Sequence, residues 1–155
     1  MSDLREKFKN FLDFNIKKQD DIAISTTRLI LAAVKDRDIE YRSKNEENHI
    51  SDSEILNLLQ NMVKQRKESV KIYQEANRID LKEREQKEIE IIETFLPKQI
   101  GEKELNEIIK ELCIEIDATG IKDLGKLINI LKDKYPGQLD LKKVAILAKE
   151  KLSKQ

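Results

Sequence analysis

The sequence predicts an all-α fold with an N-terminal helical domain of long helices over residues 1–96 and a small C-terminal three-helix domain over residues 97–155. Two observations support this. Charged and hydrophobic residues each make up 39% of the 155 residues, whereas aromatic residues make up 5% and there are only 4 Gly and 2 Pro. Apolar residues also recur at three- and four-residue spacing, as on one face of a helix. A β-sandwich or barrel would need more turn residues and more strand-forming residues.

The first two helices are expected in residues 2–41. Ser2 is a suitable N-cap for a helix that ends near Lys18. Asp20 or Asp21 is expected to start the second helix, which runs to Tyr41.

A loop and a long helix are expected next. Residues 43–50 are polar and are predicted as a loop. Ser51 and Glu54 have the capping-box spacing, in which the Ser51 hydroxyl accepts from the Glu54 N–H. The helix they open is expected to reach Ala76, and its first apolar positions are Ile55, Leu58, Leu59 and Met62.

The segment before Pro97 is expected to form the last helix of the N-terminal domain. Asp80 with Glu83 resembles another helix start, and residues 81–88 are almost wholly charged. We expect this stretch to be a helix face in water or between domains, with burial resuming at Ile89, Ile92 and Leu96. Pro97 lacks an amide donor and disfavours the α conformation at the preceding residue, so the helix should stop at Leu96.

The last third of the chain shows the most regular periodicity. Gly120 is expected to take a left-handed helix-terminating conformation, Pro136-Gly137 to form a turn, and Asp140 to cap the last helix. Because such short helices are unstable alone, they should pack together. Three apolar stripes are predicted: Leu105, Ile108, Ile109, Leu112 and Ile116; Leu124, Leu127, Ile128 and Leu131; and Leu141, Val144, Ala145, Ala148 and Leu152.

Enzymatic chemistry is not visible in the residues. Cys113 is the only cysteine, and the only histidine, His49, is distant in sequence, so neither an activated thiol nor a zinc site is predicted. No phosphate-binding or nucleophile motif is present. With thirty acidic residues, pairs such as Glu88 and Glu90 arise by chance. We therefore expect no catalytic residue, no metal ligand and no cofactor.

The composition also predicts a cytoplasmic location. A single cysteine fits a reducing compartment. No window approaches the ~18 apolar residues of a membrane span, and the charged N-terminal stretch has no apolar signal-peptide core. Asp3 and Glu6 argue against a transit peptide, which is poor in acids.

Charge is distributed unevenly although the net charge is zero. Residues 121–155 contain nine lysines against four acids, a net charge of +5, whereas residues 102–120 carry a net charge of −4. Such asymmetry is typical of a surface that binds an anionic partner. Alternatively, the lysines are the solvated faces of two amphipathic helices.

Three further features leave alternatives open. Lys64, Lys67 and Lys71 recur at helical spacing beside Arg66 and form a secondary basic face, for phosphate contact or simply for solvation. Arg28 precedes the apolar run that begins at Leu29, and an ion pair with an acid on a neighbouring helix would give it a purely structural role.

Gly125 is unusual within a helical pattern because a mid-helix glycine costs about 1 kcal/mol relative to alanine. Close helix packing, a position at the helix start and close approach of a ligand would each explain it.

Several segments in series resemble the GatB/YqeY family, whose YqeY-like members are stand-alone relatives of the tail domain of the B subunit of tRNA-dependent amidotransferase. The resemblance covers essentially the whole chain. Two positions depart from the family pattern: Gly101 replaces a Ser or Thr, and Leu141 follows Asp140 where a Gly or Pro is usual. The matching segments are residues 28–35 (RLILAAVK), 64–69 (KQRKES), 88–99 (EIEIIETFLPKQ) and 120–126 (GIKDLGK).

The resemblance implies an N-terminal helical domain followed by a small three-helix domain. In the amidotransferase the related tail is similar to a tRNA-contacting appendage, and the catalytic machinery belongs to a separate domain that this chain lacks. The family's label of carbon–nitrogen ligase with glutamine as amide donor is therefore taken as inherited from the larger subunit.

The leading hypothesis is a non-catalytic module that binds tRNA, or a complex of tRNA with an amidotransferase, through its C-terminal domain. The candidate nucleic-acid-binding residues are Lys122, Gly125, Lys126, Lys142 and Lys143. One alternative is a protein-interaction module that binds no nucleic acid. Another is an accessory component of a carbon–nitrogen ligase. Neither a membrane nor DNA is expected as a partner.

Overall fold

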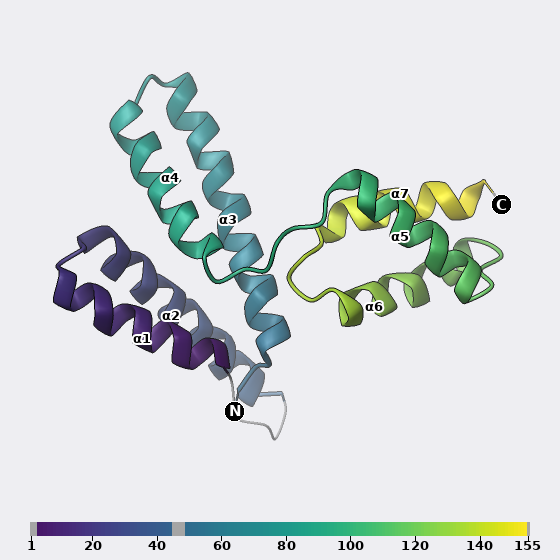
Figure 1. The fold of residues 1–155 in the computed structure, drawn as a ribbon, viewed down its shortest axis with the longest axis horizontal. Helices are drawn as coiled ribbons and strands as arrows, with labels where there is room; N and C mark the ends of the chain where they lie inside the picture. Colours follow the sequence, from purple (N-terminus) through teal and green to yellow (C-terminus); the bar gives the residue numbers. More distant parts are fainter. Residues whose placement is uncertain (1–2, 45–48, 155) are drawn as a thin grey trace. The chain divides into compact units, whose positions relative to one another are not determined.

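The computed structural model describes residues 3–44 and 49–154, and within these ranges every regular element is a helix (Figure 1). The all-α prediction is confirmed. The proposed Ser2 cap and the middle of the predicted 43–50 loop lie outside the described residues. The elements are α1 (Asp3–Lys18), α2 (Asp21–Arg42), α3 (Asp52–Glu75), α4 (Ile79–Glu93), α5 (Glu102–Glu115), the 3₁₀ turn η1 (Ile121–Asp123), α6 (Leu124–Lys134) and α7 (Leu141–Ser153).

The chain gathers into two compact units, Met1–Leu96 and Pro97–Gln155, hereafter the N-terminal and C-terminal units. Each unit has its own cluster of buried hydrophobic residues. That each folds as an independent domain stays a prediction.

The N-terminal unit consists of two helical hairpins, α1–α2 and α3–α4 (Figure 1). After α4, the ring of Phe95 packs edge-on against Phe8 and Phe11 of α1, with centroids 4.9 and 5.1 Å apart. This contact joins the end of the second hairpin to the first. The buried core is formed by Leu4, Phe8, Ile30, Val34, Ile50, Ile55, Leu59, Met62, Val63, Ile89 and Ile92.

Two of the predicted N-caps in this unit are confirmed, and one is wrong. The Asp20 carboxylate accepts from the Ala23 N–H at 3.1 Å, and the Ser51 hydroxyl accepts from the Glu54 N–H at 3.3 Å. Asp80 does not cap α4, because that helix already begins at Ile79.

The early start of α4 follows from the way α3 ends. Asn77 takes a left-handed conformation with φ of 56°, and the Arg78 N–H donates to the Tyr73 carbonyl at 2.8 Å. This helix-terminating motif turns the chain sharply, so α4 begins directly after Arg78. Asp80 is therefore the second residue of the helix rather than its cap.

The α4 helix ends at Glu93, three residues before the predicted end at Leu96. The chain continues in tighter turns, in which the Phe95 N–H donates to Ile92 and the Leu96 N–H donates to Glu93, both at 3.1 Å. The residue before a proline is disfavoured in the α conformation, which accounts for an end of the helix before Pro97.

The left-handed residue that follows α5 is Asp117, whereas the sequence predicted Gly120 in this role. Asp117 has φ of 55°, whereas Gly120 has φ of 176°, an extended conformation. The Ala118 N–H donates to the Cys113 carbonyl at 2.9 Å, which completes the helix-terminating motif. The prediction for Gly120 was wrong because α5 already ends at Glu115, five residues earlier. Asp117 can take the left-handed conformation because its short polar side chain tolerates it.

The C-terminal unit packs α5, α6 and α7 around an apolar core, and α6 and α7 run in opposite directions (Figure 1). Asp140 caps α7 as predicted, and Gly137 in the preceding turn has φ of 73°. Before α5, the Ile100 N–H donates to the Gln138 carbonyl at 2.9 Å, which joins the start of the unit to the α6–α7 loop. The buried core is formed by Leu105, Ile109, Leu112, Cys113, Leu127, Leu131, Leu139, Val144, Ala148 and Leu152.

Among the described residues, none of the helices combines the length and the apolar character that crossing a bilayer requires.

Candidate functional site

The predicted nucleic-acid-binding residues form two groups in the C-terminal unit. Lys122 lies in η1, and Gly125 and Lys126 lie in the first turn of α6. Lys142 and Lys143 lie in the first turn of α7. All four lysines are exposed, and no carboxylate in the described part of the chain forms an ion pair with them. We call Lys122 and Lys126 the α6 pair, and Lys142 and Lys143 the α7 pair.

The two pairs lie at opposite ends of the α6–α7 hairpin, because the two helices are antiparallel (Figure 1). The α7 pair lies where α6 ends. The α6 pair lies toward the C-terminal end of α7, because η1 packs against α7 and α6 and α7 are antiparallel. A helix of 11 residues is roughly 16 Å long, so the four lysines are two separate basic pairs rather than one cluster.

Each lysine pair is accompanied by one carboxylate. Asp123 accepts from the Thr119 N–H at 2.8 Å and from the Gly120 N–H at 3.4 Å. The Thr119 bond lowers the pKa of Asp123 most, the Gly120 bond and the charges of Lys122 and Lys126 lower it further, and desolvation acts in the opposite direction. Asp123 is therefore ionised at neutral pH, and the local net charge of the α6 pair is reduced.

The α7 pair has the same arrangement. Asp140 accepts from the Lys142 N–H at 3.0 Å and from the Lys143 N–H at 3.5 Å, so this carboxylate already occupies two N–H groups of the α7 N-terminus. An anionic ligand would therefore contact the lysine ammonium groups rather than the end of the helix.

Gly125 lies at the start of α6, not in a close helix contact. It is the second residue of the helix, it is exposed, and a Cβ atom at this position would meet no atom within 4 Å. Close helix packing was therefore a wrong interpretation. The helix-start interpretation fits, and the open space leaves room for a ligand.

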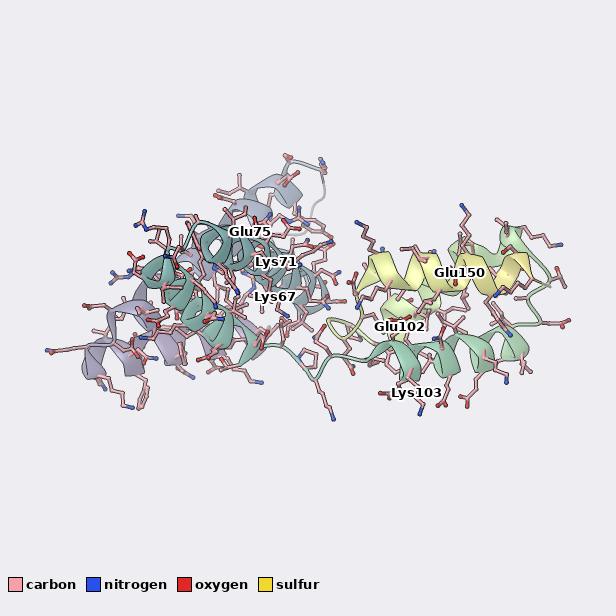
Figure 2. All side chains as sticks on the ribbon, turned by 90° about the horizontal axis from the view of Figure 1, so that it is seen from above. Lys67, Lys71, Glu75, Glu102, Lys103 and Glu150 are labelled. Atoms are coloured by element: carbon pink, nitrogen blue, oxygen red, sulfur yellow. The ribbon has the colours of Figure 1, made fainter. Side chains whose placement is uncertain are left out.

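The secondary basic face lies on α3 of the N-terminal unit. Lys64, Lys67 and Lys71 are all exposed, and Figure 2 shows Lys67 and Lys71 along this helix. Lys67 forms an ion pair with Glu93 of α4 at 3.7 Å. One of the three charges on this face is therefore offset within the unit.

Arg66, next to that face, is not solvated. Its side chain is 15% exposed, and its Nε donates to Glu88 Oε2 at 3.1 Å. Arg84 Nε donates to the other oxygen of Glu88 at 3.2 Å. Glu88 is thus buried between two guanidinium groups, one from α3 and one from its own helix.

This cluster corrects one part of the prediction that residues 81–88 form a charged face in water or between domains. Glu83, Arg84, Gln86 and Lys87 are exposed as predicted, whereas Glu88 is buried. The end of this stretch packs against α3 within the N-terminal unit, because Arg66 provides a buried positive charge for Glu88. Glu85 is half-buried nearby, 3.9 Å from Arg66, and burial together with the charge of Glu88 raises its pKa. The acidic residues of α4 are therefore partly structural.

An open groove of about 460 Å³ lies beside this cluster, between α2 and α4. Arg28 lines it, and Arg28 forms no ion pair with any described residue, so the predicted pairing with an acid on a neighbouring helix is wrong. The groove was not predicted. The only indication in the sequence was that Arg28, Arg66 and Glu88 each belong to a segment that carries the family resemblance. The lining residues are Asp21, Ile24, Ser25, Arg28, Leu29, Arg84 and Glu88.

The remaining residues with potential chemistry are dispersed. Cys113 is buried in the core of the C-terminal unit, and this burial raises the pKa of its thiol. His49 is exposed in the N-terminal unit. Within residues 3–44 and 49–154, no three His, Cys, Asp or Glu side chains are grouped so that they could hold a metal ion.

Comparison with known proteins places most of the chain in one family model. Residues 5–152 match the model described as Yqey-like protein. An uncharacterised protein of Schizosaccharomyces pombe is 33% identical over 89 residues, which cover 57% of this chain and 68% of that protein. The protein named altered inheritance of mitochondria protein 41, mitochondrial, of Lachancea thermotolerans is 30% identical over 117 residues, which cover 72% of this chain and 60% of that protein.

Proposed function

This chain belongs to the YqeY-like family, and on that premise we propose that it is a non-catalytic helical module that binds tRNA, or a complex of tRNA with an amidotransferase, through its C-terminal unit. The observation that carries this proposal is the exposure of the α6 and α7 pairs, four lysines without ion-pair partners in the described part of the chain. Lysine ammonium groups bind phosphate as mobile point charges. The two pairs would contact separate phosphates of one RNA backbone.

Binding by these lysines would be moderate and sensitive to salt. Residues 97–155 contain twelve lysines and ten acids, a net charge of +2, so the unit attracts RNA only weakly at long range. Asp123 and Asp140 reduce the field of the lysine pairs further. The proposal therefore concerns a specific, moderate affinity rather than strong binding to any polyanion.

The test is a titration of labelled tRNA at low and moderate salt with two charge-reversal variants. One variant is Lys122→Glu with Lys126→Glu, and the other is Lys142→Glu with Lys143→Glu. We expect each to weaken binding and to make the dependence of log K on log salt shallower by about 1 to 2, since each phosphate contact contributes close to one. The matched control is Lys9→Glu with Lys17→Glu, two exposed lysines of α1 outside the candidate basic faces, which changes the net charge equally in the N-terminal unit.

Two results would contradict the proposal. One is the absence of tRNA binding at micromolar protein and low salt. The other is an equal loss of affinity in the control variant, which would indicate a general effect of net charge rather than contacts at α6 and α7.

An accessory role in amide transfer is the related proposal. Stimulation of transamidation when this protein is added to a complete glutamine-dependent amidotransferase would support it, and no effect would count against it. The cytoplasmic location also remains a proposal, because a relative of this chain carries a mitochondrial name. Imaging of a tagged chain in its own cell distinguishes the two compartments.

A protein-interaction role without nucleic acid is favoured by a different observation, the α2–α4 groove of the N-terminal unit. This groove supports a binding site whether or not the lysine pairs contact RNA.

A further inference from the structure

We propose that the α2–α4 groove binds an acidic peptide segment of a partner protein, with Arg28 and Arg84 as the carboxylate contacts. The two arginines line one groove from two different helices. Arg28 is exposed and has no ion pair among the described residues, and the Arg84 side chain is 55% exposed. A planar guanidinium with free N–H groups is the side chain best suited to bidentate binding of a carboxylate.

Arg84 is held in place for such a role. Its Nε donates to Glu88 at 3.2 Å, and Glu88, only 8% exposed, is fixed by Arg66 at 3.1 Å. Arg66 in turn donates to the Met62 carbonyl at 3.4 Å. Only one of the five N–H donors of Arg84 is used in this chain of contacts, so its terminal N–H groups are free for a ligand. Ordering Arg84 in advance lowers the entropic cost of binding.

The walls of the groove favour a peptide over a nucleic acid. Asp21 and Glu88 also line the groove, so a continuous run of phosphates would meet two carboxylates, whereas a peptide can carry acidic side chains only where Arg28 and Arg84 lie. The N-terminal unit as a whole has 18 basic and 20 acidic residues, so it attracts neither a polyanion nor an acidic peptide at long range, and binding has to come from contacts within the groove. Ile24 and the half-exposed Leu29 add apolar surface. The occupant that fits is an amphipathic segment that places an apolar side chain on Leu29 and its carboxylates on the two arginines.

The probe is a synthetic helical peptide with leucine and glutamate side chains on one face, and its counterpart has glutamine in place of every glutamate. Each is titrated into the full chain while the Nε–Hε NMR signals of the arginines are followed. We expect the glutamate peptide to shift the signals of Arg28 and Arg84, and the glutamine peptide to leave both unchanged. Arg28→Gln should lower the affinity for the glutamate peptide about tenfold, the effect expected when one charged hydrogen bond is lost.

Arg37→Gln is the matched control, because Arg37 is an exposed arginine of the same helix outside the groove. An equal loss of affinity in this variant would reveal a general charge effect and overturn the proposal. The absence of shifts at Arg28 and Arg84 up to millimolar peptide would overturn it too. A loss of tRNA affinity in Arg28→Gln without loss of peptide affinity would assign the groove to nucleic acid. A negative result in the peptide titration would not affect the proposal that the lysine pairs of α6 and α7 bind tRNA, so the two proposals are tested separately.

Discussion

The two units use charged residues in opposite ways. In the described part of the chain, the buried polar and charged residues all lie in the N-terminal unit, and they are Asn15, Thr26, Thr27, Asp38 and Glu88. The buried residues of the C-terminal unit are apolar. Charge inside the N-terminal unit fixes how its helices pair, whereas charge in the C-terminal unit stays on the surface. A ligand of the C-terminal unit therefore meets mobile lysines, and a ligand of the N-terminal unit meets a partly ordered arginine.

The pair of Arg5 and Asp38 illustrates the first use. The two side chains form two parallel hydrogen bonds of 2.8 Å between α1 and α2. Asp38 also accepts from the Ile50 N–H at 2.9 Å, and Arg5 donates to the Ile50 carbonyl at 3.1 Å. These bonds join α1, α2 and the residue that precedes the α3 cap. We expect this pair to favour one helix arrangement more than it adds to net stability.

The largest effect is expected from a charge in the apolar core of the C-terminal unit. Leu112 is 4% exposed, so Leu112→Asp would bury an unpaired carboxylate and should destabilise the unit by more than about 4 kcal/mol. The matched control is Ile114→Asp on the same helix, where the side chain is 73% exposed. Amide NMR dispersion of the two units measures the result. Persisting dispersion of residues 3–96 would indicate independent folding, whereas unchanged melting of Leu112→Asp would refute the assigned core.

A smaller loss is expected when the N-terminal unit loses a buried charge. Glu88→Ala would leave Arg66 without its main carboxylate partner, and we expect a cost of about 3 kcal/mol. Glu90→Ala removes an exposed acid two residues further along the same helix and should change the free energy of unfolding by less than about 0.5 kcal/mol. Urea denaturation followed by circular dichroism compares the two variants. Equal effects would show that the Arg66–Glu88 pair is energetically unimportant.

Acid should weaken the N-terminal unit through Asp38. The hydrogen bonds from Arg5 hold the pKa of Asp38 below its usual value, with a further lowering by the Ile50 N–H, and burial acts in the opposite direction. The stabilisation is therefore present above the unfolded pKa of about 3.9 and is lost as the pH falls through the lower folded value. Glu85 acts in the opposite sense, because its raised pKa means that its ionisation at rising pH costs stability.

Asp38→Asn tests this dependence. The variant should be less stable than the parent chain by about 2 kcal/mol at neutral pH, the typical contribution of hydrogen bonds to a charged group. The difference should shrink as the pH falls through the lowered pKa of Asp38, because the parent carboxyl is then also protonated. Urea midpoints over a pH series measure it. A difference that is constant over the series would mean that Asp38 is not ionised in its pair with Arg5.

Helix termination should be improvable in both units. Gln19 and Asp117 take left-handed conformations with φ of 59° and 55°, which cost side chains with a Cβ atom roughly 1 kcal/mol. Gln19→Gly and Asp117→Gly should each stabilise their own unit by about that amount. Thermal denaturation measures the gain. A loss of stability at Asp117 would show that its carboxylate has a role beyond the turn.

The smallest expected effect separates the two remaining explanations of Gly125. Gly125→Ala should stabilise the C-terminal unit by about 0.5 kcal/mol, since the position is helical and open. If a ligand needs close approach there, the same variant should lose tRNA affinity while its melting temperature rises. Unchanged affinity would leave Gly125 as a helix-start residue only.

The helices themselves were largely predictable because their determinants are local. The stripe from Leu105 to Leu112 and the caps at Asp20, Ser51 and Asp140 depend on spacings of a few residues, and the structure confirms them. The errors arose at helix ends, where a non-glycine residue took the left-handed position: Asp117 did so instead of Gly120. Propensity favours glycine there but does not require it.

The candidate sites were predictable only in part. Exposure of Lys122 and Lys142 could be expected from the amphipathic pattern, but their separation at opposite ends of a hairpin depends on the antiparallel course of α6 and α7. The groove lined by Arg28 and Arg84 could not be expected, because its two walls are far apart in the sequence.

The sequence alone determined the helical class, the positions of the apolar stripes and most of the caps, since periodicity and capping act within one or two turns. Tertiary packing decided which charges are structural and which are free. Glu88 and Lys67 belong to similar charged stretches of sequence, yet Glu88 is buried between two arginines and Lys67 remains exposed. The difference arises because a charge is buried only where packing brings an opposite charge from another part of the chain within hydrogen-bonding distance.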